Sequence, residues 1–144
     1  MSDTIISFLK DYEPVNEVQT LLRNIVLLQA KFEMNAEDDL LFQTSKEMQS
    51  KLLDMSMKKY ALLVEVVNGS SLEQLNSHVE KVHSEIKKFA SEHEMNSITG
   101  QKANTLNSQL EATKSFKNAK EQYGTLKPLD EILKDEATLL EIFS

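Results

Sequence analysis

All three histidines of the chain lie in one stretch, NSHVEKVHSEIKKFASEH, where they alternate with glutamates. Histidine and carboxylate side chains bind metals and act as general acids and bases in catalysis. Two side chains on one helix share a metal when they are three or four residues apart. His78 and His83 are five apart, which places them about 140° from each other, and His93 follows about 15 Å further along the axis. The spacing therefore predicts a helix surface and no metal site.

Other catalytic patterns are equally sparse. A di-metal helical bundle requires two Glu-x-x-His motifs, and this sequence has one, Glu80 to His83. No Gly-rich phosphate loop and no nucleophile motif occur, and the chain has no cysteine. We therefore expect a protein that is not an enzyme, with no catalytic residue, no bound metal and no cofactor.

Two charged patterns also invite a functional interpretation. Lys114, Lys117 and Lys120 are spaced by three, but three lysines in a chain of net charge −7 are typical of a solvated helix face. The acidic pairs Asp130-Glu131 and Asp135-Glu136 suggest a two-carboxylate mechanism. Adjacent residues on a helix diverge by about 100°, however, and helix starts attract acids. Both patterns therefore favour an ordinary acidic helical surface.

The composition predicts an all-α fold. Of 144 residues only three are glycine and two are proline, which leaves little sequence for hairpins and long loops, and no segment alternates with the period of a strand. A net charge of −7 argues against nucleic acid as the main partner. No window is apolar enough to span a membrane. No secretory signal precedes the first helix, so we expect an intracellular protein, in the cytoplasm or nucleus.

The chain 1–144 is predicted to be a single helical domain with about five segments, two of them long. Ser2 or Asp3 starts the first, Asn68-Gly69 ends the second, and a capping box of Ser70 and Glu73 starts the third. Gly124 ends the fourth segment. The segments are a short amphipathic arm at 1–13, a long helix at 15–68 with a possible break near 35–39, a heptad helix at 71–95, a weaker helix at 101–123 and an amphipathic helix at 128–143.

Helix length predicts the shape. A helix over residues 40–68 would be about 43 Å long. A compact sphere made of the whole chain would be only about 37 Å across. An elongated helical bundle or coiled coil is therefore expected.

The apolar faces of the helices differ in width. Between Leu40 and Val67 two adjacent apolar groups cover an arc of about 220°, so this helix needs neighbours on at least two sides. The first group is Leu41, Met48, Leu52, Met55, Leu62, Leu63 and Val66. The second is Phe42, Leu53, Met57, Tyr60, Val64 and Val67.

The candidate partner-binding residues lie on two narrower apolar faces, one on the heptad helix and one on the last helix. The heptad helix has one seam about 100° wide, and the last helix has large apolar anchors among five acids, a pattern typical of helix-in-groove docking. Whether the last helix folds back onto the chain or docks on a partner stays open at this point. The candidates are Leu72, Leu75, Val79, Val82, Ile86, Phe89, Leu129, Ile132, Leu133, Leu139, Leu140 and Phe143.

These patterns together favour a non-enzymatic structural or scaffold subunit of a multi-protein assembly. It would pair through its long helices with other helical protein subunits; a hetero-oligomer is favoured, and a homo-oligomer stays the alternative. The alternative is a self-contained helical-bundle adaptor that binds a short peptide or helix of a partner.

Overall fold

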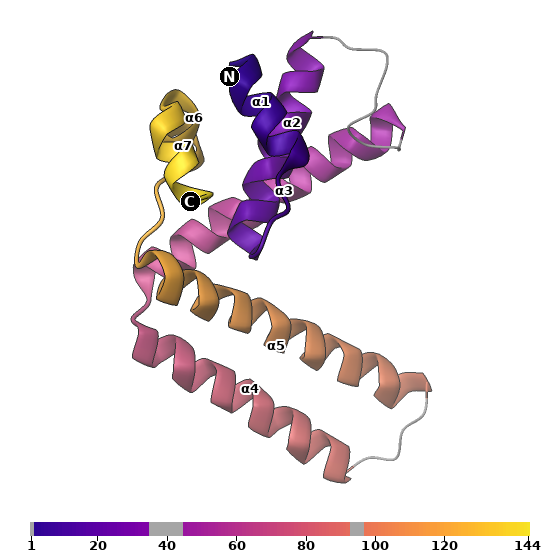
Figure 1. Cartoon of the computed structure of the whole chain (residues 1–144). Helices are drawn as coiled ribbons and strands as arrows, with labels where there is room; N and C mark the ends of the chain where they lie inside the picture. Colours follow the sequence, from indigo (N-terminus) through magenta and orange to yellow (C-terminus); the bar gives the residue numbers. More distant parts are fainter. Residues whose placement is uncertain (1, 35–44, 93–96) are drawn as a thin grey trace. The chain divides into compact units, whose positions relative to one another are not determined.

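The computed structural model describes residues 2–34, 45–92 and 97–144, and every regular element in these ranges is a helix (Figure 1). The all-α prediction is confirmed, whereas the predicted count of five segments is not, because the described residues form seven helices. The helices are α1 (Asp3–Asp11), α2 (Glu17–Met34), α3 (Lys46–Gly69), α4 (Leu72–Glu92), α5 (Ser97–Tyr123), α6 (Leu129–Lys134) and α7 (Glu136–Ile142). The break expected near residues 35–39 lies outside the described residues.

The chain divides into two compact units, and the division falls within α3. The first unit comprises Met1–Val64 and Lys127–Ser144, and the second comprises Glu65–Leu126. The first unit therefore joins segments from both ends of the sequence, whereas the second is continuous.

Helix α1 in the first unit starts and ends on side-chain hydrogen bonds. The hydroxyl of Ser2 accepts from the backbone N–H of Ile5 at 3.4 Å, so Ser2 is the N-cap. At the other end, the guanidinium of Arg23 on α2 donates to the carbonyl oxygens of Leu9 (2.7 Å) and Lys10 (3.1 Å). Carbonyls in the last turn have no partner within their own helix, so Arg23 both caps α1 and fastens it to α2.

Helix α2 is buried on nearly all sides. Leu22 and Leu27 lie about 140° apart on the helix, yet both are 0% exposed. The run LLRNIVLLQA explains this burial, because its apolar residues leave no continuous polar face. Helix α2 is therefore the central element of the first unit. Its other buried residues are Val18, Gln19, Leu21, Ile25, Val26, Leu28, Ala30 and Lys31.

The last predicted helix appears as two short ones, because Asp135 interrupts it. The backbone of Asp135 is extended, and its carboxylate accepts from the N–H of Ala137 (3.0 Å) and the hydroxyl of Thr138 (2.8 Å). These hydrogen bonds, the one from Thr138 first, lower the pKa of Asp135 below its ordinary value of 3.8. The charged cap thus stabilises α7 above that pH, and the contribution is lost as the pH falls through the lowered pKa.

Helix α7 is joined to the first two helices by polar and aromatic contacts. The buried amide of Gln19 accepts from the N–H of Val15 and donates to the carbonyl of Ile142, both at 2.9 Å. The hydroxyl of Tyr12 donates to the carbonyl of Phe143 at 3.1 Å, and the two rings meet edge to face at 5.0 Å. The end of the sequence is therefore integrated into the first unit.

The second unit is a helical hairpin in which α4 and α5 run antiparallel (Figure 1). Leu75, Val82 and Phe89, seven residues apart on α4, are 4%, 1% and 8% exposed. Leu110 and Thr113 of α5 are buried as well. The spacing of the α4 residues is that of a heptad seam, and the hairpin covers this seam within the chain.

The two ends of the hairpin are fixed differently. At the open end, the amide of Asn68 donates to the carbonyl of Leu126 at 2.8 Å and accepts from its N–H at 2.9 Å. Gly124 ends α5 with a φ of 71°, in the left-handed region that favours glycine. At the other end, the ammonium of Lys102 lies 5.2 Å from the centre of the Phe89 ring, within range of a cation–π contact.

Candidate functional site

A row of exposed apolar side chains lies on α3 in the first unit. Met48, Met55 and Leu62, here called the Met48 row, are 56%, 53% and 48% exposed. They are seven residues apart, so successive members lie about 10.5 Å along the axis and only about 20° around the helix. Leu52, half-buried, adjoins the row. Three large exposed side chains in line on one helix are a repeated apolar feature, of the kind that marks interaction sites on protein surfaces.

The buried face of α3 beside this row is partly polar. Gln49 and Ser56 are 1% and 2% exposed, and they share this face with Tyr60 and Leu63. The ammonium of Lys31 on α2 is hydrogen-bonded to Gln49, and the hydroxyl of Tyr60 donates to the carbonyl of Lys127 at 2.7 Å. Helix α3 thus buries polar side chains and exposes methionines, although the burial of polar groups is costly and the burial of apolar ones is favourable.

Lysines border the Met48 row. Lys51 contacts Glu47 at 3.6 Å and Lys58 contacts Asp54 at 2.9 Å, each one helical turn earlier. In both pairs the side chains are more than 60% exposed. Lys59 on the other side of the row is also exposed. The row therefore has three lysines along its edges and one acid, Glu65, which lies beside Leu62 in line with Lys51 and Lys58.

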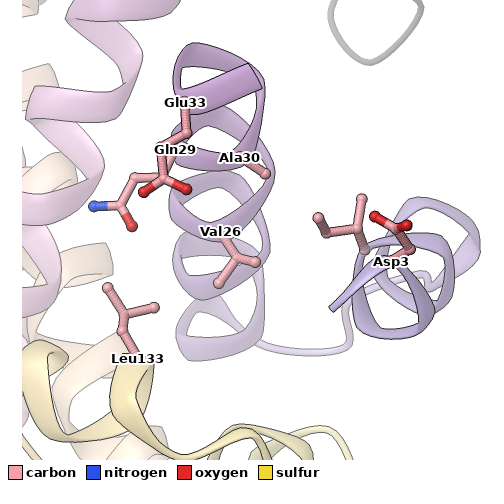
Figure 2. A pocket seen from close by; sticks show the side chains of 7 residues that line it. Asp3, Val26, Gln29, Ala30, Glu33 and Leu133 are labelled. Atoms are coloured by element: carbon pink, nitrogen blue, oxygen red, sulfur yellow. The ribbon is translucent and has the colours of Figure 1, made fainter. Parts of the chain in front are cut away.

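A pocket of about 420 Å³ lies among α1, α2 and α6 in the same unit. Figure 2 shows it with Asp3 on α1, Glu33 on α2 and Leu133 on α6. Its buried wall is apolar, since Val26 and Ala30 are 1% and 8% exposed. No lining residue is cationic, so the pocket suits a positive charge carried on an aliphatic stem. The lining residues are Asp3, Ile6, Val26, Gln29, Ala30, Glu33 and Leu133.

The candidate residues predicted on the heptad helix lie on α4, on the face that meets α5. Leu75, Val82 and Phe89 are buried. Val79 and Ile86 are half-buried, and Leu72 in the first turn is 38% exposed. The structure thus brings these residues together within the hairpin.

The candidates at the end of the chain lie on α6 and α7. Ile132 and Leu139 are 0% exposed and Phe143 is 5% exposed. Leu129 and Leu133 are half-buried, and Leu140 is 38% exposed. The helices fold back onto the first unit, so most of this apolar surface is covered within the chain.

The histidines and lysines that could have formed a metal or phosphate site lie in ordinary surroundings on the helices. His78 and His83 are exposed on α4, and His93 lies outside the described residues. No group of three metal-binding side chains occurs within residues 2–34, 45–92 and 97–144. Lys120 donates to the carbonyl of Val67 at 3.0 Å, and Lys117 lies 3.9 Å from Glu121. These two lysines thus contact groups of the second unit itself.

Two of the acids at the end of the chain form hydrogen bonds that hold helix ends in place. Asp135 is the cap of α7. Glu136 accepts from the backbone N–H of Ser2 at 2.7 Å and lies 3.3 Å from its hydroxyl. The pair therefore links the start of α7 to the start of α1.

The Met48 row was not among the candidate residues predicted from the sequence. The signal was present, because all three members belong to the first of the two apolar groups on this helix. The sequence alone did not show which members of the two apolar groups would be buried.

The pocket could not be predicted from a sequence motif, since its walls come from three separate helices.

None of the described helices is long and apolar enough to cross a membrane. Comparison with models of protein families, with curated proteins and with solved structures gives no match.

Proposed function

We propose that the protein is a non-enzymatic helical subunit that pairs with another protein chain through the Met48 row of α3. The observation that supports the proposal is the exposure of Met48, Met55 and Leu62 along one line. The apolar arc of this helix is wide enough to need neighbours on two sides. Within the chain one side is packed, and a partner would supply the other.

The energy available from this row is adequate for a specific contact. Full burial of a side chain of this size is worth about 1.5–3 kcal/mol, so covering the exposed half of three contributes roughly 2–4 kcal/mol. Methionine side chains are flexible and adapt to different partner surfaces, which suits two of the three to such a role. The row would be one anchor within a larger contact, because stable interfaces also need a polar rim.

A second candidate is the adaptor function, in which the first unit binds a short peptide. The pocket among α1, α2 and α6 favours it, because the acids Asp3 and Glu33 line it and none of its lining residues is cationic. A lysine or arginine side chain of a peptide would lay its aliphatic stem on the apolar wall and bring its charge to one of these acids. The elongated coiled-coil arrangement and the intracellular location expected from the sequence stay predictions.

Replacing the whole row by glutamine separates binding from folding. The triple substitution Met48→Gln, Met55→Gln and Leu62→Gln should leave the melting temperature of the isolated chain within a few degrees, because these side chains are half in water. The same variant, tagged and purified from its native cells, should lose the stoichiometric partner that the unmodified chain retains. Ser50→Gln, on an exposed position of the same helix, is the control and should retain it.

The outcomes separate the two candidates. If the triple variant retains its partner but Asp3→Asn with Glu33→Gln loses it, the pocket is the binding site and the row is not. If the triple variant unfolds, the row belongs to the core and the proposal is wrong.

A further inference from the structure

We infer that the partner segment on the Met48 row is an acidic amphipathic helix, an inference that rests on the proposed function. The argument is charge complementarity along the edges of the row. Lys51 and Lys58 lie about 40–60° to one side of Met55, and Lys59 lies about 40° to the other. A helix laid along the row would meet these three ammonium groups first.

Two of the three acids of α3 are further from the row than its lysines, and the third, Glu65, follows Lys51 and Lys58 on the same side at the Leu62 end. Glu47 and Asp54 lie about 80–100° from Met55, behind Lys51 and Lys58. They contact those lysines at 3.6 and 2.9 Å, in pairs that are mostly exposed. Exposed pairs of this kind contribute little to stability, so the lysines can turn to carboxylates on a partner at small cost. The positive edges are therefore available to a docked helix.

A second copy of the chain fits this surface less well. Two copies of the row facing each other would bring the two sets of Lys51, Lys58 and Lys59 into one interface. Like charges across a helix pair are unfavourable, whereas glutamate or aspartate flanks would meet the lysines with the opposite sign. The partner helix should accordingly carry large apolar residues every three or four positions with acids on both sides of them.

The charge of the whole chain makes the inference sharply testable. The chain carries a net charge of −7, so attraction by the overall field would favour a basic peptide. Only the local placement of the three lysines favours an acidic one. Two synthetic helical peptides with the same leucine positions, one flanked by glutamates and the other by lysines, therefore give opposite answers under the two hypotheses.

The experiment titrates each peptide into the full chain carrying ¹³C-labelled methionine methyl groups. The glutamate-flanked peptide should shift the Met48 and Met55 methyl resonances and bind about tenfold or more tightly than the lysine-flanked peptide, with a difference that shrinks at high salt. Lys51→Glu with Lys58→Glu and Lys59→Glu should reverse this preference. A control with Lys81→Glu, Lys87→Glu and Lys88→Glu on α4 changes the net charge equally and should not reverse it.

Three results would overturn the inference. The lysine-flanked peptide binds as well or better, neither peptide shifts the two methyl groups, or sedimentation shows that the chain pairs with itself through the row. The proposed function is judged separately from these results, by whether the glutamine variant of the row stays folded and loses its native partner.

Discussion

Removing residues 128–144 should abolish the cooperative melting of the first unit. The deletion takes away Ile132, Leu139 and Phe143, all nearly or fully buried. Full burial of each is worth about 1.5–3 kcal/mol, and their sum is a large part of the roughly 5–15 kcal/mol that stabilises a typical domain. Circular dichroism should show loss of helicity beyond the deleted residues and a lower or broadened transition.

Two neighbouring leucines give the matched control. Leu139→Ala removes a side chain that is 0% exposed and should cost about 2–5 kcal/mol. Leu140→Ala changes a side chain that is 38% exposed and should cost clearly less. If the truncated chain instead keeps its helicity per residue and its melting temperature, the final helices do not belong to the first unit.

Val82→Asp should disrupt the hairpin of α4 and α5. Val82 is 1% exposed in the middle of the seam, and an unpaired carboxylate there costs several kcal/mol, on the order of 3–5, or forces the helices apart. Amide hydrogen exchange of the intact chain should accelerate throughout α4 and α5, while the amides of α2 stay protected.

Glu80→Lys is the comparison for the seam. Glu80 is exposed on the same helix, so its replacement should change the free energy of unfolding by no more than about half a kcal/mol. Equal exchange rates in the two variants would mean that α4 does not pack along this line.

Local signals in the sequence were sufficient for the helices and several of their ends. Ser2 is the cap of α1, Asn68-Gly69 closes α3, and Gly124 ends α5 as expected. These features depend on residues within one turn of each other, so short-range chemistry decides them.

The start of α4 offered two overlapping capping boxes, and the predicted one was wrong by one residue. The box at the start of α4 is Ser71 with Gln74, whose side chain and backbone exchange hydrogen bonds of 2.8 and 3.1 Å, and not Ser70 with Glu73. Glutamine at the third helical position serves this motif as glutamate does. Likewise, Asp135 starts a new helix inside the segment predicted as one, because its carboxylate captures the backbone N–H of Ala137.

Burial of the long helices could not be read from one sequence. The wide apolar arc over residues 40–67 suggested a helix enclosed on two sides, yet Met48 and Met55 are more than half exposed and α2 is the enclosed helix. Periodicity measures how much apolar surface a helix has, whereas burial depends on which neighbours reach it. The Met48 row is where these two quantities disagree most.

Photo-crosslinking from the row tests its proposed function most directly. A benzoylphenylalanine placed at Met55 in the tagged, full-length protein, irradiated in its native cells, should give one discrete adduct with another protein. The same group at Ser50, exposed about 140° away on α3, should not give that adduct. Adducts of equal yield from both positions, or none from Met55 while the native complex is intact, would contradict the docking of a partner on the Met48 row.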